Sequence, residues 1–177
     1  NKGGTSADLA TSGGSDSDPE GMGYDATIEI GDAVTGMTGL TLWAGYSKIE
    51  QDAGHASMDG DQEETTYAIS YAMGSFKVGY QWSEQDLGTS SGVQEYTNEG
   101  YGITFNVNDD LSIGYNHYES DQDNSTDVTA EASSIQIAYS MGGASIRLAE
   151  GSAENTAYQT TALYDRDATL LSVALAF

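Results

Sequence analysis

The stretch that decides the fold is the C-terminal run Thr169-Leu170-Leu171-Ser172-Val173-Ala174-Leu175-Ala176-Phe177. Side chains alternate across a β-strand, so every second residue shares a face. One face of this run carries the larger residues Thr169, Leu171, Val173, Leu175 and Phe177. A final aromatic ring is unusual in a soluble domain, whose ends are commonly polar, and it is typical of a strand that ends at a membrane interface. The run therefore favours a membrane β-barrel.

Composition narrows the function classes. The chain has 177 residues with 22 Gly, 1 Pro, 12 Tyr, no Cys and a net charge of −23. This acidity opposes binding to nucleic acid, whose phosphates would be repelled. The absence of Cys excludes disulfide and thiolate chemistry. No apolar run approaches the ~20 residues that a transmembrane helix needs, and the sequence shows no signal peptide, so a mature chain or a fragment is expected.

Alternating segments recur along the chain, joined by tight turns with Gly, Asn and Asp and by longer acidic loops. We predict strands at Tyr24–Asp32, Leu40–Glu50, Thr65–Met73, Phe76–Glu84, Tyr96–Val107, Leu111–Glu119, Ser133–Met141, Ala144–Glu150 and Asp165–Phe177. The long loops are then Asp52–Glu64, Asp86–Glu95 and Ser120–Glu131. This pattern predicts an all-β, antiparallel chain of about nine strands.

Each predicted strand has one apolar, aromatic face and one face of small and polar residues. The apolar set includes Tyr67, Tyr71, Phe76, Tyr80, Tyr101, Phe105, Tyr139 and Phe177. A transmembrane barrel turns such a face to lipid and the polar face to a wet lumen, whereas a soluble sandwich packs the apolar faces together. The acids gather in the long connections and the rings near strand ends, which favours the transmembrane barrel.

Two hairpins resemble those of a known family. The run from Tyr101 to Tyr115 (YGITFNVNDDLSIGY), the run from Ala138 to Ile146 (AYSMGGASI) and the terminal strand look like hairpins of Gram-negative general porins, especially those of alphaproteobacteria. The resemblance extends over residues 24–177. It implies a trimeric barrel of sixteen strands in the outer membrane that passes small hydrophilic solutes. It also implies that Phe177 serves as the signal for membrane assembly.

The chain is shorter than members of that family, and an odd number of antiparallel strands cannot close a barrel by antiparallel pairing. We therefore expect the C-terminal part of a porin, with residues 1–23 as an external acidic loop and residues 24–177 as part of one transmembrane barrel. One alternative is a complete eight-stranded barrel over Leu40–Phe177, which would be a structural protein or an adhesin. A second is a secreted β-sandwich that binds a ligand.

Candidate pore-lining residues fall on the polar parity. Lys77 and Arg147 are basic residues in mid-strand, and in porins basic residues on the wall face acids across the constriction. Asp25 and Glu29 are candidate acidic partners. The remaining polar candidates are Gln81, Asn116 and Gln136. Because external acids raise the local concentration of cations, we expect a channel that prefers cations.

The acidic loops suggest calcium, which prefers several hard oxygen ligands. Candidate ligands are Asp59 and Asp61 in one loop and Asp121 and Asp123 in another. Acidic loops could also hold divalent cations that bridge lipopolysaccharide phosphates. No other cofactor is expected. His55 and His117 are far apart in the sequence, and His117 has the parity of an interface residue, so they predict neither a metal site nor a catalytic base. We expect no enzyme.

Overall fold

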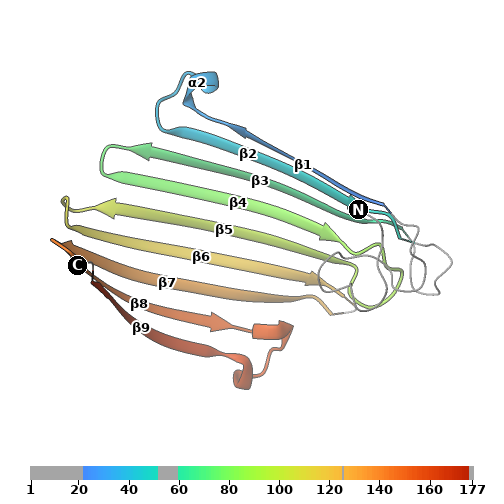
Figure 1. Cartoon of the computed structure of the whole chain (residues 1–177). Coiled ribbons are helices and arrows are strands. Elements are labelled where there is room, and N and C mark those ends of the chain that lie inside the picture. Colours follow the sequence, from blue (N-terminus) through green and yellow to red (C-terminus); the bar gives the residue numbers. More distant parts are fainter. Residues whose placement is uncertain (1–21, 52–59, 125, 176–177) are drawn as a thin grey trace.

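The computed structural model describes residues 22–51, 60–124 and 126–175. They form one antiparallel sheet of nine strands in sequence order, from β1 to β9 (Figure 1). The strands are β1 (Gly23–Ile30), β2 (Leu40–Ile49), β3 (Gln62–Met73), β4 (Phe76–Asp86), β5 (Glu95–Asn106), β6 (Leu111–Asp123), β7 (Val128–Met141), β8 (Ala144–Glu154) and β9 (Arg166–Leu175). The short helices are α2 (Asp32–Thr35), η1 (Thr156–Tyr158) and η2 (Ala162–Tyr164).

The sheet is open within the described residues. Each strand pairs with its neighbours in the sequence, and β1 and β9 form the two edges. Because every pairing is antiparallel, β1 and β9 point the same way and cannot close the sheet by an antiparallel pairing. The described strands therefore do not form the closed eight-stranded barrel over Leu40–Phe177, and β1, which precedes that range, pairs with β2.

The β-sandwich is also excluded for the described part of the chain, which contains a single sheet. No hydrophobic side chain among these residues is buried. A sandwich would bury its core between two sheets about 10 Å apart. The sheet therefore has no core of its own and must bury its apolar face against another medium.

The two ends of the sheet carry different connections. At one end lie the tight turns Gly74-Ser75 and Gly142-Gly143, the turn 107–110 and the segment with α2; at the other end lie the longer connections (Figure 1). Gly74 and Gly142 have φ of +57° and +59°, which other residues rarely adopt. The side chain of Asn108 accepts hydrogen bonds from the amides of Asp110 and Leu111, at 2.9 Å each, and so fixes a third turn.

Several predicted boundaries were wrong. The segment 120–131 is not a long loop, because β6 continues to Asp123 and β7 begins at Val128, with Gln122 paired to Val128. Similarly β3 begins at Gln62, and β8 continues to Glu154. Asp32 belongs to helix α2 and not to the first strand. The prediction assigned these polar and acidic residues to loops. In the structure the strands continue through them, because their backbone groups still pair with the neighbouring strand.

The register places the predicted apolar residues on one face. Tyr67 pairs with Trp82, Tyr80 with Tyr101, and Phe76 with Phe105. Their rings meet across the strands: the ring centroids are 5.9 Å apart for Tyr67 and Trp82, and 4.5 Å apart for Phe76 and Phe105. Such cross-strand aromatic pairs stabilise a sheet and fix its register. Phe177 lies outside the described residues.

This apolar face remains exposed along the whole sheet. Its exposed members include Tyr67, Ile69, Val78, Tyr101, Ile103, Ile135, Leu148 and Leu171. An apolar surface of this extent is not found facing water in a soluble monomer. No helix among the described residues is long and apolar enough to cross a membrane.

We predict that Ile103→Arg, at the centre of the apolar face, lowers the free energy of unfolding by about 2–4 kcal/mol, because it places a charge against hydrocarbon. The control is Thr104→Arg, one residue further along β5 and therefore on the opposite face. Urea unfolding in lipid vesicles measures both. Equal destabilisation by the two variants would contradict a lipid-facing apolar surface.

Candidate functional site

All residues predicted to line the pore lie on one face of the sheet, opposite the aromatic face. Cross-strand pairs demonstrate it: Gln81 faces Gly100, Asn116 faces Gly102, and Gln136 faces Gly114. The same alternation places Asp25, Glu29, Lys77 and Arg147 on this polar face. Their neighbours on this face are mostly Gly, Ala and Ser, so most of its side chains are short and the face is polar. Such a surface leaves space for water.

The charges of the polar face are balanced. In the described strands its acids are Asp25, Glu29 and Glu64, and its bases are Lys77, Arg147 and Arg166. Lys77 on β4 and Arg147 on β8 are separated by three strands, which corresponds to about 19 Å at a spacing of about 4.8 Å. They are therefore separate charges and not a cluster.

Trp43 lies on the polar face, and sequence reasoning did not select it. Its indole Nε1 donates a 2.8 Å hydrogen bond to the Glu29 carboxylate on the neighbouring strand. The alternation of side chains along β2 already placed Trp43 on the other face from Leu42 and Ala44. This alternation could have identified Trp43 as a residue of the polar face. The bond fixes the Glu29 carboxylate in position, so this acid has a defined place on the wall.

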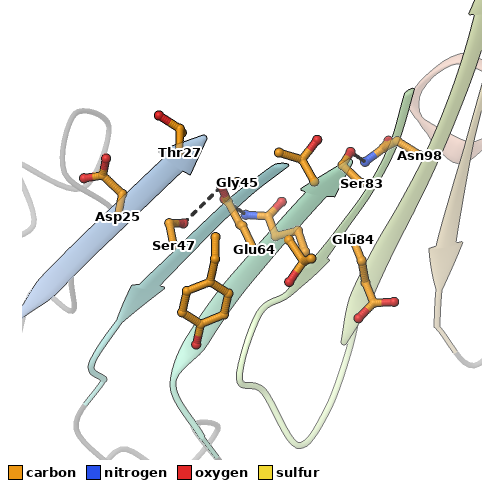
Figure 2. Close-up of a pocket in the computed structure, with 12 residues that line it drawn as sticks. Asp25, Thr27, Gly45, Ser47, Glu64, Ser83, Glu84 and Asn98 are labelled. Atoms are coloured by element: carbon orange, nitrogen blue, oxygen red, sulfur yellow. Dashed lines mark hydrogen bonds between the residues drawn. The ribbon is translucent and has the colours of Figure 1, made fainter. Parts of the chain in front are cut away.

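A shallow depression of about 330 Å³ lies toward the end of the sheet that carries the longer connections (Figure 2). Asp25, Ser47 and Glu64 line it from three adjacent strands. Ser47 Oγ and Gln85 Nε2 donate to the two oxygens of Glu64, at 3.4 and 3.0 Å. The carboxylates of Asp25 and Glu64 therefore give this part of the wall a negative charge.

The connection between β8 and β9 folds over the polar face. We name residues 155–158 the mouth turn. The hydroxyls of Tyr158 and Ser120 lie 2.7 Å apart, and the Tyr158 ring lies 5.4 Å from that of Tyr96. Asn155, Ala157 and Tyr158 all have positive φ, which costs energy in residues other than glycine. The mouth turn and the polar face line an open groove of about 480 Å³.

Most acids of the described strands lie on the aromatic face, not on the polar face. Except for Glu150, which lies near the middle of β8, they occupy the strand parts nearest the longer connections, and we name this set the acidic band. Its members are Glu63, Glu84, Asp86, Glu95, Glu99, Glu119, Asp121, Asp123, Glu131, Glu150, Glu154 and Asp167. Lys48 is the one Lys or Arg among the described residues on this face.

Lys48 ties the β2–β3 connection to the sheet. Its Nζ lies 2.9 Å from Asp61 Oδ2 and 2.7 Å from Glu63 Oε1. The hydrogen bond from Lys48, together with one from the Gln51 amide, lowers the pKa of the Asp61 carboxyl below its usual range. One oxygen of this calcium candidate is thus bonded to a lysine.

The other calcium candidates are scattered. Asp59 lies outside the described residues. Asp121 and Asp123 lie on β6 instead of a loop, and Asp121 accepts a hydrogen bond from the Thr129 hydroxyl on β7. Calcium binding by these residues stays a prediction.

One possible metal-binding group was missed. His117, Glu119 and Glu131 bring their ligand atoms within 4.8 Å of one another. His117 and Glu119 are two residues apart on a strand, which the sequence could have placed on one face. The contribution of Glu131 depends on the register of β6 with β7, which the sequence did not reveal.

We predict that Lys48→Met raises the pKa of Asp61 toward the ordinary value of about 3.9. A carboxyl whose folded pKa is lowered stabilises the fold above its unfolded pKa and loses this contribution as the pH falls through its folded pKa. Carboxyl ¹³C shifts across a pH titration measure the change. Lys77→Met, on the opposite face, should leave Asp61 unaffected; an unchanged Asp61 in Lys48→Met would refute the pairing.

We predict that Tyr158→Phe loosens the mouth turn, because it removes the hydroxyl contact with Ser120. Loss of about 1 kcal/mol corresponds to about fivefold faster hydrogen exchange of the amides in residues 155–165. The matched control is Tyr164→Phe in the same connection, whose hydroxyl forms no hydrogen bond with another of the described residues; only its backbone carbonyl accepts one, from Thr156. Equal exchange in both variants would show that the Tyr158 hydroxyl does not hold the turn.

Comparison with known proteins agrees with this geometry. The family model for Gram-negative porins matches residues 1–157. No curated protein matches the sequence significantly. The match covers most of the chain and includes every strand from β1 to β8. The chain therefore belongs to the Gram-negative porin family, whose members are channel-forming strand proteins of the outer membrane and not enzymes.

Proposed function

We propose that the polar face of this sheet is part of the wall of a water-filled channel for passive diffusion of small hydrophilic solutes and ions. The observation that carries the proposal is the separation of an apolar, aromatic face from a face of mostly small and polar residues across nine strands. Lipid then contacts the aromatic face and water contacts the Gly, Ala and Ser of the other. A narrow barrel fills its interior with side chains, whereas a wide barrel leaves a channel for water. The small side chains of the polar face therefore fit a wide lumen.

Closure requires further strands at the edges β1 and β9, because unpaired backbone groups are costly in lipid. We propose a barrel of sixteen strands, of which these nine are the C-terminal part, and a homotrimer as the assembly. The support is the antiparallel order of the sheet together with the family. In this barrel the tight turns face the periplasm and the longer connections face the exterior.

We propose that cations are preferred, although the wall itself is balanced in charge. Asp25 and Glu64 lie toward the external end of the polar face, whereas Lys77 and Arg147 lie toward the tight turns. The other two charges are placed the other way round: the acid Glu29 lies toward the tight turns, and the base Arg166 lies toward the external end. An incoming cation thus meets Asp25 and Glu64 near the mouth, and the acidic band outside adds to the negative potential there.

The test is the variant Lys77→Glu with Arg147→Glu, studied in planar bilayers under a salt gradient. Removing two bases from the wall and adding two acids should raise the ratio of cation to anion permeability. The effect should shrink toward 1 M salt, where the Debye length is about 3 Å. Unchanged reversal potentials at low salt would refute the role of these two residues.

Lys48→Glu is the control, because it makes the same kind of substitution on the aromatic face, with half the total charge change of the double variant. A wall charge acts directly on ions in the lumen, whereas a charge on the aromatic face acts over distance, so the reversal potential of Lys48→Glu should shift by much less than half of the shift in the double variant. A shift as large as that of the double variant would mean that the two faces are not separated as proposed.

A further inference from the structure

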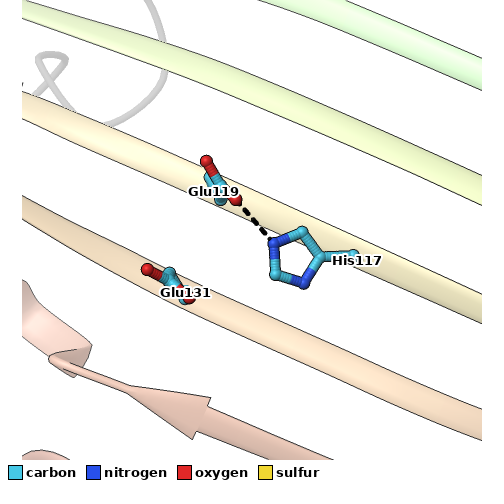
Figure 3. Close-up of side chains that lie close together, drawn as sticks. All are labelled: His117, Glu119 and Glu131. Atoms are coloured by element: carbon cyan, nitrogen blue, oxygen red, sulfur yellow. Dashed lines mark hydrogen bonds and ion pairs between the residues drawn. The ribbon is translucent and has the colours of Figure 1, made fainter.

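Three side chains of types that can bind metal ions lie close together on the aromatic face of two neighbouring strands (Figure 3). His117 and Glu119 belong to β6. Glu131 belongs to the neighbouring strand β7 and is the direct cross-strand partner of Glu119. All three lie on the aromatic face, so they point away from the channel wall. Nothing in the proposed permeation path requires them.

The geometry is close to that of a metal site. His117 Nε2 and Glu119 Oε1 are 2.7 Å apart, and the ligand atoms of all three residues lie within 4.8 Å of one another. Zinc holds nitrogen and oxygen ligands at about 2.0–2.2 Å, so ligand atoms around it are typically about 3–3.6 Å apart. Glu119 is partly exposed and Glu131 is exposed, so both side chains have space to rotate toward this arrangement.

The register gives a physical reason for a cation at this place. Glu99, Glu119, Glu131 and Glu154 face one another in a single row across β5, β6, β7 and β8. Like charges directly opposite each other destabilise a sheet. In the described part of the chain no Lys or Arg forms an ion pair with this row, and the side chain that contacts one of its carboxylates is His117. A divalent ion at its centre would remove most of the repulsion.

His117 is already held in place for this role. Its ring lies 5.2 Å from the Tyr101 ring, and its side chain is 16% exposed, whereas that of Glu119 is 45% exposed. The residue opposite His117 on β7 is Ser133, which is small and leaves space beside the imidazole. A ligand that is fixed before binding loses little entropy when the metal arrives.

We propose that His117, Glu119 and Glu131 bind one divalent transition-metal ion of the zinc class at the outer surface of the barrel, just external to the aromatic residues. One imidazole with two carboxylates suits zinc, whereas calcium and magnesium prefer oxygen ligands alone. The fourth coordination position remains open to water. The ion links β6 to β7 and neutralises the centre of the row.

The test is titration of the detergent-solubilised, metal-free protein with Zn²⁺, followed by calorimetry. We expect one ion per chain at this site, and at least tenfold weaker binding in His117→Ala and in Glu131→Gln. Two matched controls should bind normally: His55→Ala, which removes the other histidine, and Glu150→Gln, an acid of the same face that lies outside the row. Circular dichroism verifies that each variant is folded.

A second measurement identifies the ligands. Cu²⁺ bound in the same site should give an electron paramagnetic resonance spectrum with coupling to one imidazole nitrogen, and His117→Ala should abolish that coupling. If His117→Ala folds and keeps native Zn²⁺ affinity and the nitrogen coupling, or if His55→Ala loses them, the proposal is wrong. Loss of binding in Glu150→Gln as large as in Glu131→Gln would also overturn it, because it would indicate general attraction to acids.

Discussion

The backbone hydrogen-bond ladder is the interaction on which this structure depends. The described residues bury no hydrophobic side chain, so the nine strands are held in one surface by pairing between neighbours. A membrane makes that ladder obligatory, because lipid offers no partner to an unpaired amide or carbonyl. The ladder also fixes the register, and the register determines which side chains face lipid and which face the lumen.

The two faces carry different charge, and this difference bears on how the channel selects ions. The wall has equal numbers of acids and bases in the described strands, whereas the aromatic face carries the acidic band with Lys48 as its one Lys or Arg. Most of the acidity of these strands therefore faces away from the lumen. In the proposed channel, its influence on permeating ions would act over distance and weaken with salt, whereas Asp25 and Glu64 would act at the wall itself.

The acidic band and the proposed metal site belong to the same level of the barrel. Both lie external to the aromatic residues, where the barrel leaves the hydrocarbon region and charged side chains become tolerable. The Lys48 pairs neutralise one part of this band with a protein group. Among the described residues, the row from Glu99 to Glu154 has no such lysine or arginine partner, which is the reason for proposing a cation there.

The sequence by itself determined the fold class, the two faces and the family. Alternation depends on the strand period alone, so it placed Tyr67 and Phe105 on one face and Lys77 and Gln136 on the other without any knowledge of neighbours. Only the tertiary structure determined which residues of neighbouring strands lie opposite each other. The extension of β6 to Asp123, the approach of Tyr158 to Ser120, and the meeting of Glu131 with His117 all depend on register and on chain folding between distant residues. No local pattern encodes a cross-strand partner, because many registers satisfy the same alternation.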